Sequence, residues 1–318
     1  MAIHVIRFSQ PGQASRWGVA FGASVVPLEG TYRSTSDFLT KGGIEEAKAA
    51  TRDAATLPLD TLHLESPITN RQQVILLGLN YACHAIESGV SPRDVTFNTI
   101  FTKAPSSLSG ARDDIIRPPH VSLLDYEIEL GLVMGRPLPP YEEVTPSTLP
   151  NFLAGIVVIN DISARDVQLP QGQFYKGKSY RTFGPTGPFL TLLDAEEWQQ
   201  VPRLRMQLSV NGEIRQNALC GSMIFPPHKT LTELAGLHDM SPGDLIATGT
   251  PGGCAAKAPG KIGLFLFQHI LTERMRWVLF RRLEKSNRLY LQPGDIVQAR
   301  IRTDDGALDL GEQRNHVM

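Results

Sequence analysis

The 318-residue chain has little of what marks extracellular, membrane or nucleic-acid-binding proteins. It contains only three cysteines, an odd number that argues against a disulfide framework and indicates a reducing compartment. Its 31 Lys and Arg residues balance 32 Asp and Glu residues, so no charge excess predicts binding to nucleic acid or to an acidic membrane. The longest uncharged apolar run, residues 262–272, is too short to cross a bilayer. The first residues lack the apolar core of a signal peptide, so we expect a cytoplasmic protein.

Strand-like alternation and turn residues dominate what the chain does contain, with little sustained helical periodicity. Apolar and polar residues alternate over 204–210 and again over 297–303. Asn211-Gly212 and Asp305-Gly306 follow these stretches, and such dipeptides are typical of tight β-hairpin turns. The pattern predicts an α+β fold that is mostly β, not the βαβ repeat of a Rossmann fold.

The chain also predicts two domains. Residues 1–66 contain short alternating stretches and one helical stretch over 43–50, which indicates a small N-terminal α+β domain. Residues 67–318 are long enough to bury a full core and form the larger, β-rich domain.

Two glutamates in one apolar, strand-like stretch are the first chemical signal. Glu127 and Glu129 are two residues apart, and positions i and i+2 of a strand point to the same face. Burying two like charges together is costly, and a divalent cation relieves that cost; oxygen ligands favour Mg²⁺, Ca²⁺ or Mn²⁺. Asp161 offers a third carboxylate where the apolar stretch 154–159 gives way to a polar turn. The alternative is that the glutamates lie on a solvated face or pair with arginines.

Three further segments carry candidate groups, each with an ordinary structural alternative. If a helix begins near Tyr81, His84 and Glu87 are one turn apart, and a carboxylate beside an imidazole suits a general base. The alternative is a helix cap with a surface ion pair. Lys178 lies among glycine and proline residues, which predicts a loop that brings an ammonium group to an anion, or a merely solvated loop. The turn at Thr250 offers hydroxyls and amides for a carboxylate but lacks the spacing of a phosphate loop.

The order of these segments is more specific than any one of them, and it resembles the fumarylacetoacetate hydrolase family. The resemblance runs over residues 70–252 and resumes at residue 293. It implies a mixed β-sandwich roll for the large domain, a small domain at the N-terminus and a homodimer. The segments that carry it are, in order, Asn80-Tyr81-x-x-His84-x-x-Glu87, Phe101-x-Lys103, Asp125-Tyr126-Glu127-Ile128-Glu129-Leu130, Asn160-Asp161-Ile162-Ser163-Ala164-Arg165-Asp166-Val167-Gln168, Gly177-Lys178-Ser179 and Pro242-Gly243-Asp244-Leu245-Ile246-Ala247-Thr248-Gly249-Thr250-Pro251.

The resemblance also implies roles for individual residues and a reaction. The family's functional positions fall on the metal ligands Glu127, Glu129 and Asp161 for Mg²⁺ or Mn²⁺, the catalytic residues His84, Glu87 and Lys178, and the substrate contacts Arg165, Gln168 and Thr250. The implied reaction is hydrolysis of a C–C bond in a 2,4-dioxo acid, an acylpyruvate or fumarylpyruvate-like compound, through an enolate that the metal stabilises. Decarboxylation of oxaloacetate or keto–enol isomerisation of an oxo dicarboxylate is the alternative among enzymes, and a non-catalytic binding protein is the second alternative.

Two departures from the family pattern concern the substrate end of the site. An insertion over 255–291 predicts a basic, apolar helix that packs on the body or on a dimer partner, covers the active site, or touches a membrane surface. Arg181 stands where relatives often have an acid, and it would bind a second substrate carboxylate if it faces the pocket. The apolar residues of the insertion at helical spacing are Leu264, Phe267, Leu271, Met275 and Val278 or Leu279.

Overall fold

The computed structural model describes residues 2–52, 54, 56–257, 273–284 and 286–318. One large, mostly antiparallel sheet runs through the described part in the order β4-β3-β2-β1-β14-β11-β10-β17-β6-β7, and β5 also pairs with β1. Its strands are β1 Ile3–Ser9, β2 Arg16–Phe21, β3 Ser24–Pro27, β4 Leu57–Pro58, β5 His63–Glu65, β6 Val74–Gly78, β7 Thr99–Thr102, β10 Ile128–Met134, β11 Leu153–Asn160, β14 Leu190–Leu192 and β17 Leu245–Ala247.

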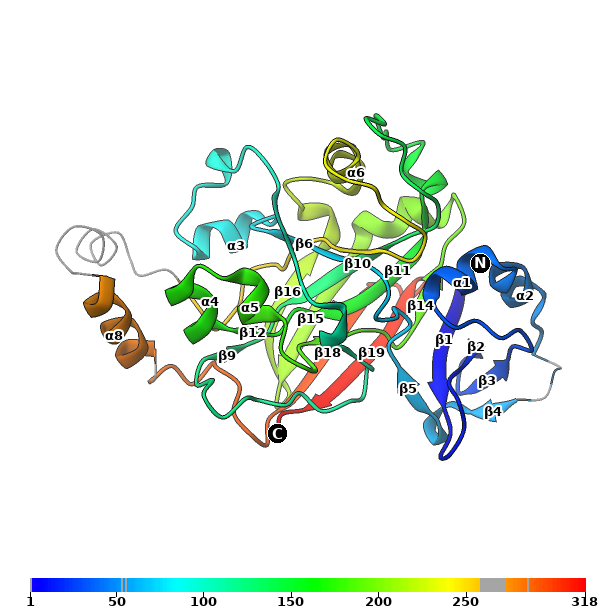
Figure 1. Ribbon diagram of the computed structural model, residues 1–318, viewed down its shortest axis with the longest axis horizontal. Coiled ribbons are helices and arrows are strands. Elements are labelled where there is room, and N and C mark those ends of the chain that lie inside the picture. The colour runs from blue at the N-terminus through cyan, green and yellow to red at the C-terminus, as the bar shows by residue number, and fades with distance from the viewer. Residues whose placement is uncertain (1, 53, 55, 258–272, 285) are drawn as a thin grey trace.

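A four-stranded antiparallel sheet packs against the middle of the large one (Figure 1). Its order is β16-β15-β18-β19, and the strands are β15 Leu204–Val210, β16 Glu213–Leu219, β18 Ile296–Thr303 and β19 Asp309–His316. Both predicted hairpins are confirmed, because β15 pairs with β16 and β18 with β19. Asn211 and Gly212 have φ values of 52° and 82°, the left-handed backbone that a two-residue hairpin turn requires.

The main hydrophobic core lies between these two sheets. Along β15 every second residue is buried, so one face carries Met206 and Leu208 into the core. They meet Leu130 and Leu132 of β10, which is buried on both faces. Each such side chain contributes about 1.5–3 kcal/mol when fully buried. The α+β, mostly β prediction is therefore confirmed, and β10 is buried along its whole length.

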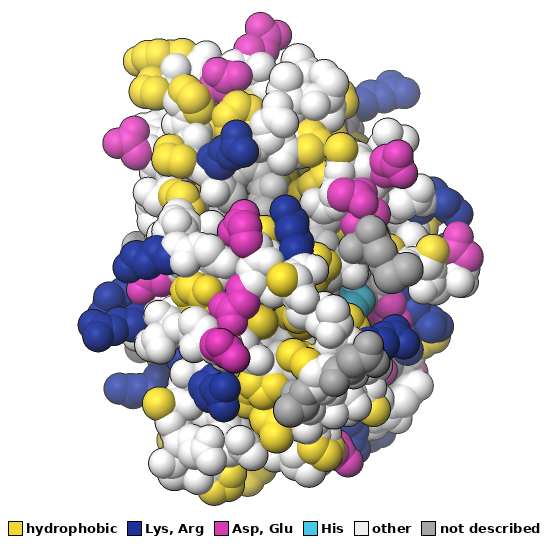
Figure 2. Space-filling view, turned by 90° about the vertical axis from the view of Figure 1, so that its right-hand side faces the viewer, with side chains coloured by type: hydrophobic (Ala, Val, Ile, Leu, Met, Phe, Trp, Pro, Cys, Tyr) yellow, Lys and Arg dark blue, Asp and Glu magenta, His cyan; other side chains and the backbone are white. Residues whose placement is uncertain are grey.

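The N-terminal unit continues the large sheet. The predicted meander is present as β1, β2 and β3, and β1 also pairs with β14, so the sheet crosses residue 66 without a break. The helices α1 Thr35–Thr40 and α2 Gly43–Ala49 cover it, with Phe38 stacked on Trp17 at 4.6 Å between ring centroids. Figure 2 shows this end of the molecule, where basic and acidic side chains are interspersed.

The remaining helices surround the other end of the large sheet. Two separate two-stranded sheets accompany these helices, one formed by β9 and β12 and the other by β8 and β13. None of the helices in the described ranges has the length and apolarity needed to span a membrane. The bounds of these helices and short strands are α3 Ala82–Glu87, α4 Arg165–Gln171, α5 Phe174–Lys178, α6 Pro227–Ala235, α8 Glu273–Glu284, β8 Leu108–Ser109, β9 Leu124–Asp125, β12 Ser163–Ala164 and β13 Gly184–Pro185.

Candidate active site

The three carboxylates predicted as metal ligands lie together and are buried. The register of β10 on β11 pairs Ile128 with Asn160, so the next residue at each strand end, Glu127 and Asp161, are neighbours. The Asp161 N–H donates to the Glu127 carbonyl at 2.8 Å. Glu129 lies one residue inside β10, and one carboxylate oxygen from each of the three acids lies within 4.8 Å of the other two. The structure thus brings together the set that the sequence predicted.

Three buried basic side chains surround these acids. Lys178 donates to a Glu127 oxygen at 2.7 Å and forms an ion pair with Asp161. Lys103 pairs with Asp161, and Arg165 pairs with Glu127. Burial opposes ionisation of Glu127, but the Arg165 and Lys178 charges outweigh it and hold its pKa below the ordinary value. Lys178 was predicted in a loop, but it ends α5 and is buried, which excludes the solvated alternative.

Glu129 remains without such compensation. No ion pair among the described residues reaches Glu129, to which the Gly249 N–H donates at 2.9 Å. Burial raises the pKa of Glu129 well above its ordinary value, and the nearby charges of Asp161 and Glu127 raise it further. A cation that prefers oxygen ligands, such as Mg²⁺, Mn²⁺ or Ca²⁺, would offset the repulsion at Glu129, so these residues fit a divalent metal.

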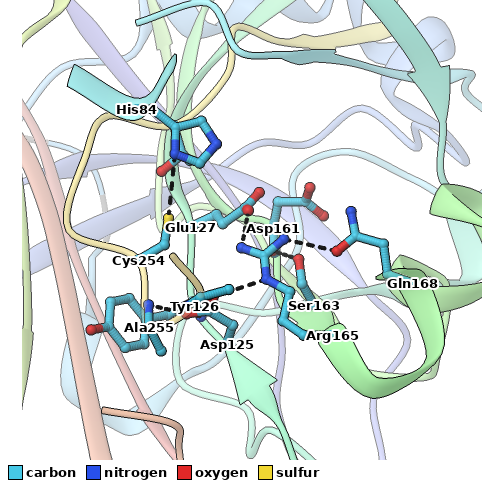
Figure 3. A network of polar contacts seen from close by, with 12 residues as sticks. His84, Asp125, Tyr126, Glu127, Asp161, Ser163, Arg165, Gln168, Cys254 and Ala255 are labelled. Carbon is cyan, nitrogen blue, oxygen red and sulfur yellow. Dashed lines mark hydrogen bonds and ion pairs between the residues drawn. The ribbon is translucent and has the colours of Figure 1, made fainter. Parts of the chain in front are cut away.

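Arg165 and Gln168, predicted as substrate contacts, form one unit at the start of α4 (Figure 3). They are one turn apart, and Nη1 of Arg165 donates to Oε1 of Gln168 at 2.8 Å. The opposite side of the guanidinium pairs with Asp125 at 2.9 Å. Asp125 also accepts hydrogen bonds from the N–H groups of Ala255 and Ala256 at 2.8 and 3.0 Å. Asp125 therefore positions both Arg165 and the chain that enters the insertion.

Replacing Asp125 with asparagine should lower the free energy of unfolding by about 3 kcal/mol, because it removes one partner of a buried ion pair. Urea unfolding of the metal-free protein measures this loss. The matched control is Asp304→Asn, which breaks the pair of Arg205 with an aspartate that is 65% exposed, and it should cost little. Equal losses in the two variants would contradict the positioning role of Asp125.

His84 and Glu87 lie on α3, which begins where the sequence predicted, directly after Tyr81. His84 is half-buried; its burial lowers the pKa below 6.5, against the charge of Glu127, so the imidazole is neutral at pH 7. The expected contact with Glu87 is not made. The Glu87 carboxylate instead accepts the Gly253 N–H at 2.7 Å and lies 3.4 Å from Nζ of Lys257.

A cavity of about 400 Å³ borders the acid cluster at Glu127. Thr250 lines it as predicted, with its hydroxyl donating to the Ile128 carbonyl at 3.0 Å. Arg181 does not line it, so the condition for its binding a second substrate carboxylate is not met: after Lys178 the chain turns outward and leaves Arg181 exposed. The residues that line the cavity are Leu77, Gly78, Leu79, His84, Ser88, Thr99, Phe101, Glu127, Arg165, Gln168, Leu169, Phe174, Lys178, Thr250, Ala256, Lys257, Trp277 and Phe280.

The insertion helix α8 reaches this cavity through residues that the sequence analysis missed. Trp277 and Phe280 line the cavity, whereas Met275 and Val278 of the predicted apolar stripe are 55% and 56% exposed. The predicted residues before 273 lie outside the described ranges. Trp277 and Phe280 are three residues apart, a spacing that places both on the same face of a helix. This spacing was the sequence signal that could have identified them. Lys103, which pairs with Asp161, belongs to the motif Phe101-x-Lys103, but the sequence alone predicted no function for it.

Comparisons with known proteins agree with this architecture. Residues 73–318 match the family described as fumarylacetoacetate (FAA) hydrolase C-terminal. A protein of Burkholderia multivorans that is named as a hydrolase is 33% identical over 261 residues, covering 78% of this chain and 86% of its own. The mitochondrial oxaloacetate tautomerase of Rattus norvegicus is 34% identical over 221 residues, 68% of each chain.

Solved structures share the whole fold. A Mycobacterium abscessus protein, named as a 2-hydroxyhepta-2,4-diene-1,7-dioate isomerase, aligns with a TM-score of 0.72 and 30% identity, covering 100% of this chain and 98% of its own. A fumarylacetoacetate hydrolase from Exiguobacterium antarcticum aligns with a TM-score of 0.72 and 27% identity over 99% of both chains. The expected roll is thus confirmed. With 246 consecutive residues matched, from 73 to 318, the chain belongs to the fumarylacetoacetate hydrolase family.

Proposed function

We propose that the protein is a divalent-metal-dependent hydrolase that cleaves a C–C bond of a 2,4-dioxo acid. One observation carries the proposal: Glu127 of the acid cluster, the neutral His84 imidazole and the cations Arg165 and Lys178 line a single cavity. Members of the family act as hydrolases, isomerases and tautomerases, so the family alone does not select the reaction.

Glu127, Glu129 and Asp161 would hold the metal, with Mg²⁺ or Mn²⁺ as the proposed ions. Such an ion supplies Lewis-acid stabilisation of negative charge on the oxygens of a 2-oxo acid. The protein residues are then left with binding and proton transfer.

His84 is the group suited to move the proton. Because its imidazole is neutral at pH 7, it can take a proton from a water molecule that attacks the distal carbonyl carbon. The Lys178 ammonium keeps its proton, since burial is outweighed by Asp161 and Glu127 and its pKa is raised to about 12. It therefore acts as a fixed positive charge beside the carbon–carbon bond that breaks, not as a base. Arg165 and Gln168 are placed to orient the substrate carboxylate.

A small panel of substrates tests the proposal. Acetylpyruvate, benzoylpyruvate, fumarylpyruvate and oxaloacetate are each incubated with the protein and Mg²⁺ or Mn²⁺, with and without a chelator. We expect pyruvate and the free acid from an acylpyruvate, with at least about a 100-fold loss when the chelator is present. Turnover that is unchanged by chelation, or restricted to oxaloacetate, would contradict the proposal.

Tautomerisation of oxaloacetate is the second candidate, because the rat tautomerase is 34% identical to this chain over 221 residues, an identity close to the 33% of the Burkholderia protein. That reaction moves a proton between carbon and oxygen and consumes no water. A change in the ultraviolet absorbance of the oxaloacetate enol, with no release of pyruvate, would distinguish tautomerisation from hydrolysis.

A further inference from the structure

The cavity above the acid cluster has a charged floor and a largely apolar remainder. Glu127, Arg165 and Lys178 form the floor, where a metal and the oxo-acid group would bind. Away from them, most of the lining is aliphatic or aromatic. The apolar lining residues are Leu77, Leu79, Phe101, Leu169, Phe174, Ala256, Trp277 and Phe280.

Part of this apolar lining comes from the insertion. Trp277 and Phe280 of α8 pack edge to face, with ring centroids 5.7 Å apart and planes at 85°. Phe280 is only 9% exposed and belongs to the main core, against which Trp277 also packs. Figure 1 shows α8 beside α4, at the end of the molecule opposite the N-terminal unit. The pair is therefore anchored to the body of the protein and presents an aromatic surface to the cavity.

A second aromatic pair lines the same cavity. Phe101 of β7 and Phe174 of α5 lie 5.0 Å apart, and Nζ of Lys178 is 5.4 Å from the centre of the Phe101 ring. This places the second pair next to the charged floor. Aromatic side chains thus border the space between the reacting end of a substrate and its far end.

Among the described residues, a second carboxylate would find little compensating charge at the end of the cavity away from Glu127, Arg165 and Lys178. Arg181, predicted for that role, is exposed and does not line the cavity. Lys257 does line it, but its ammonium lies 3.4 Å from the Glu87 carboxylate, which already offsets its charge. An anion placed against an apolar wall without a free cation pays a large desolvation cost.

We propose that Trp277 and Phe280 form the subsite for the acyl group, so that the substrate is a 2,4-dioxo monoacid with a bulky apolar acyl group, aryl or branched alkyl. This inference rests on the proposed hydrolase function. It assigns to the insertion a role in substrate selection, through contact with the group that leaves as the free acid.

The experiment compares kcat/KM for benzoylpyruvate and acetylpyruvate in four proteins: the wild type, Trp277→Ala, Trp277→Phe and the control Val278→Ala. Val278 lies on the same helix but is exposed. We expect the wild type to prefer benzoylpyruvate, and Trp277→Ala to lower the benzoyl-to-acetyl ratio about tenfold or more. Trp277→Phe should retain most of the ratio, and Val278→Ala should leave it unchanged. Thermal unfolding of each variant establishes that it is folded.

The outcomes separate the inference from the function on which it rests. If no acylpyruvate is cleaved by the wild type, the proposed function fails. If acylpyruvates are cleaved but the ratio is the same in Trp277→Ala as in the wild type, the function stands and the subsite is wrong. A wild-type preference for fumarylpyruvate that is lost in Lys257→Met would also overturn the inference, because it would show that Lys257 binds a second carboxylate.

Discussion

Replacing Glu129 with glutamine should abolish metal binding and lower turnover about a thousand-fold or more, yet make the metal-free protein more stable. Glutamine has the same shape, and its amide oxygen can still accept the Gly249 N–H. It lacks the charge that Asp161 and Glu127 repel and that burial penalises, the causes that raise the pKa of Glu129 in the folded protein. The substitution thus removes a metal ligand and a source of repulsion together.

The size of the stability gain depends on pH. A carboxyl group with a raised pKa in the folded state favours folding fully only below its unfolded pKa, about 4.5. This contribution is lost as the pH rises toward the folded value. The gain from Glu129→Gln should therefore be absent at pH 4 and reach about 1 kcal/mol or more at pH 7.

Calorimetric titration with Mn²⁺ and thermal unfolding in chelator measure the two effects. Glu213→Gln is the control, because this glutamate is 69% exposed, lies on β16 of the four-stranded sheet and is not one of the clustered acids; it should change neither quantity. A Glu129→Gln protein that binds Mn²⁺ with wild-type affinity would show that the metal ligands have been assigned wrongly.

The acid cluster was predictable from the sequence because its geometry is largely local. Two glutamates that are two residues apart share one face of a strand. An acid that directly follows an apolar strand lies where the ends of neighbouring strands meet. What the sequence did not contain is the register of β10 on β11, which places Glu127 beside Asp161. The family resemblance supplied that step. The roles of these residues, the native metal and a homodimer stay predictions.

Residues that act across long distances in the chain were harder to find. Lys103 reaches Asp161 because the β7 end of the large sheet lies beside α5, and nothing near residue 103 indicates this. Trp277 lies outside the apolar spacing that predicts the insertion helix, and the residues at that spacing, Met275 and Val278, are exposed. Arg181 shows that closeness in sequence does not ensure closeness in space. It follows Lys178 by only three residues, but one turn of the chain points its side chain outward.

The fold shows the same division between local and distant interactions. Hairpin dipeptides fix neighbouring strands, and both predicted hairpins are present. The pairing of β1 with β14 joins segments that are separated by more than 180 residues, as in Ile3 opposite Leu192. No local pattern encodes such a pairing. It arises because the apolar faces of both strands are buried in one core.

Replacing His84 with asparagine should lower kcat for acylpyruvate hydrolysis by about 100- to 10,000-fold while Mn²⁺ affinity stays within a few-fold of wild type. Asparagine keeps a polar side chain of similar size but cannot accept a proton at neutral pH. His84 is not among the metal-ligand cluster, so calorimetric titration should not detect the change. His238→Asn, at an exposed site after α6, is the control and should change neither quantity.

The pH profile gives a second and independent readout of His84. Since burial lowers its pKa below 6.5, wild-type kcat/KM should rise with pH through a midpoint below 6.5 and then level off. In the His84→Asn variant this acidic limb should vanish from the residual rate. Hydrolysis that persists at wild-type rate would remove His84 from the mechanism. Loss of hydrolysis with retained enolisation of oxaloacetate would instead show that the metal site and the imidazole serve separable steps, since only hydrolysis requires an activated water.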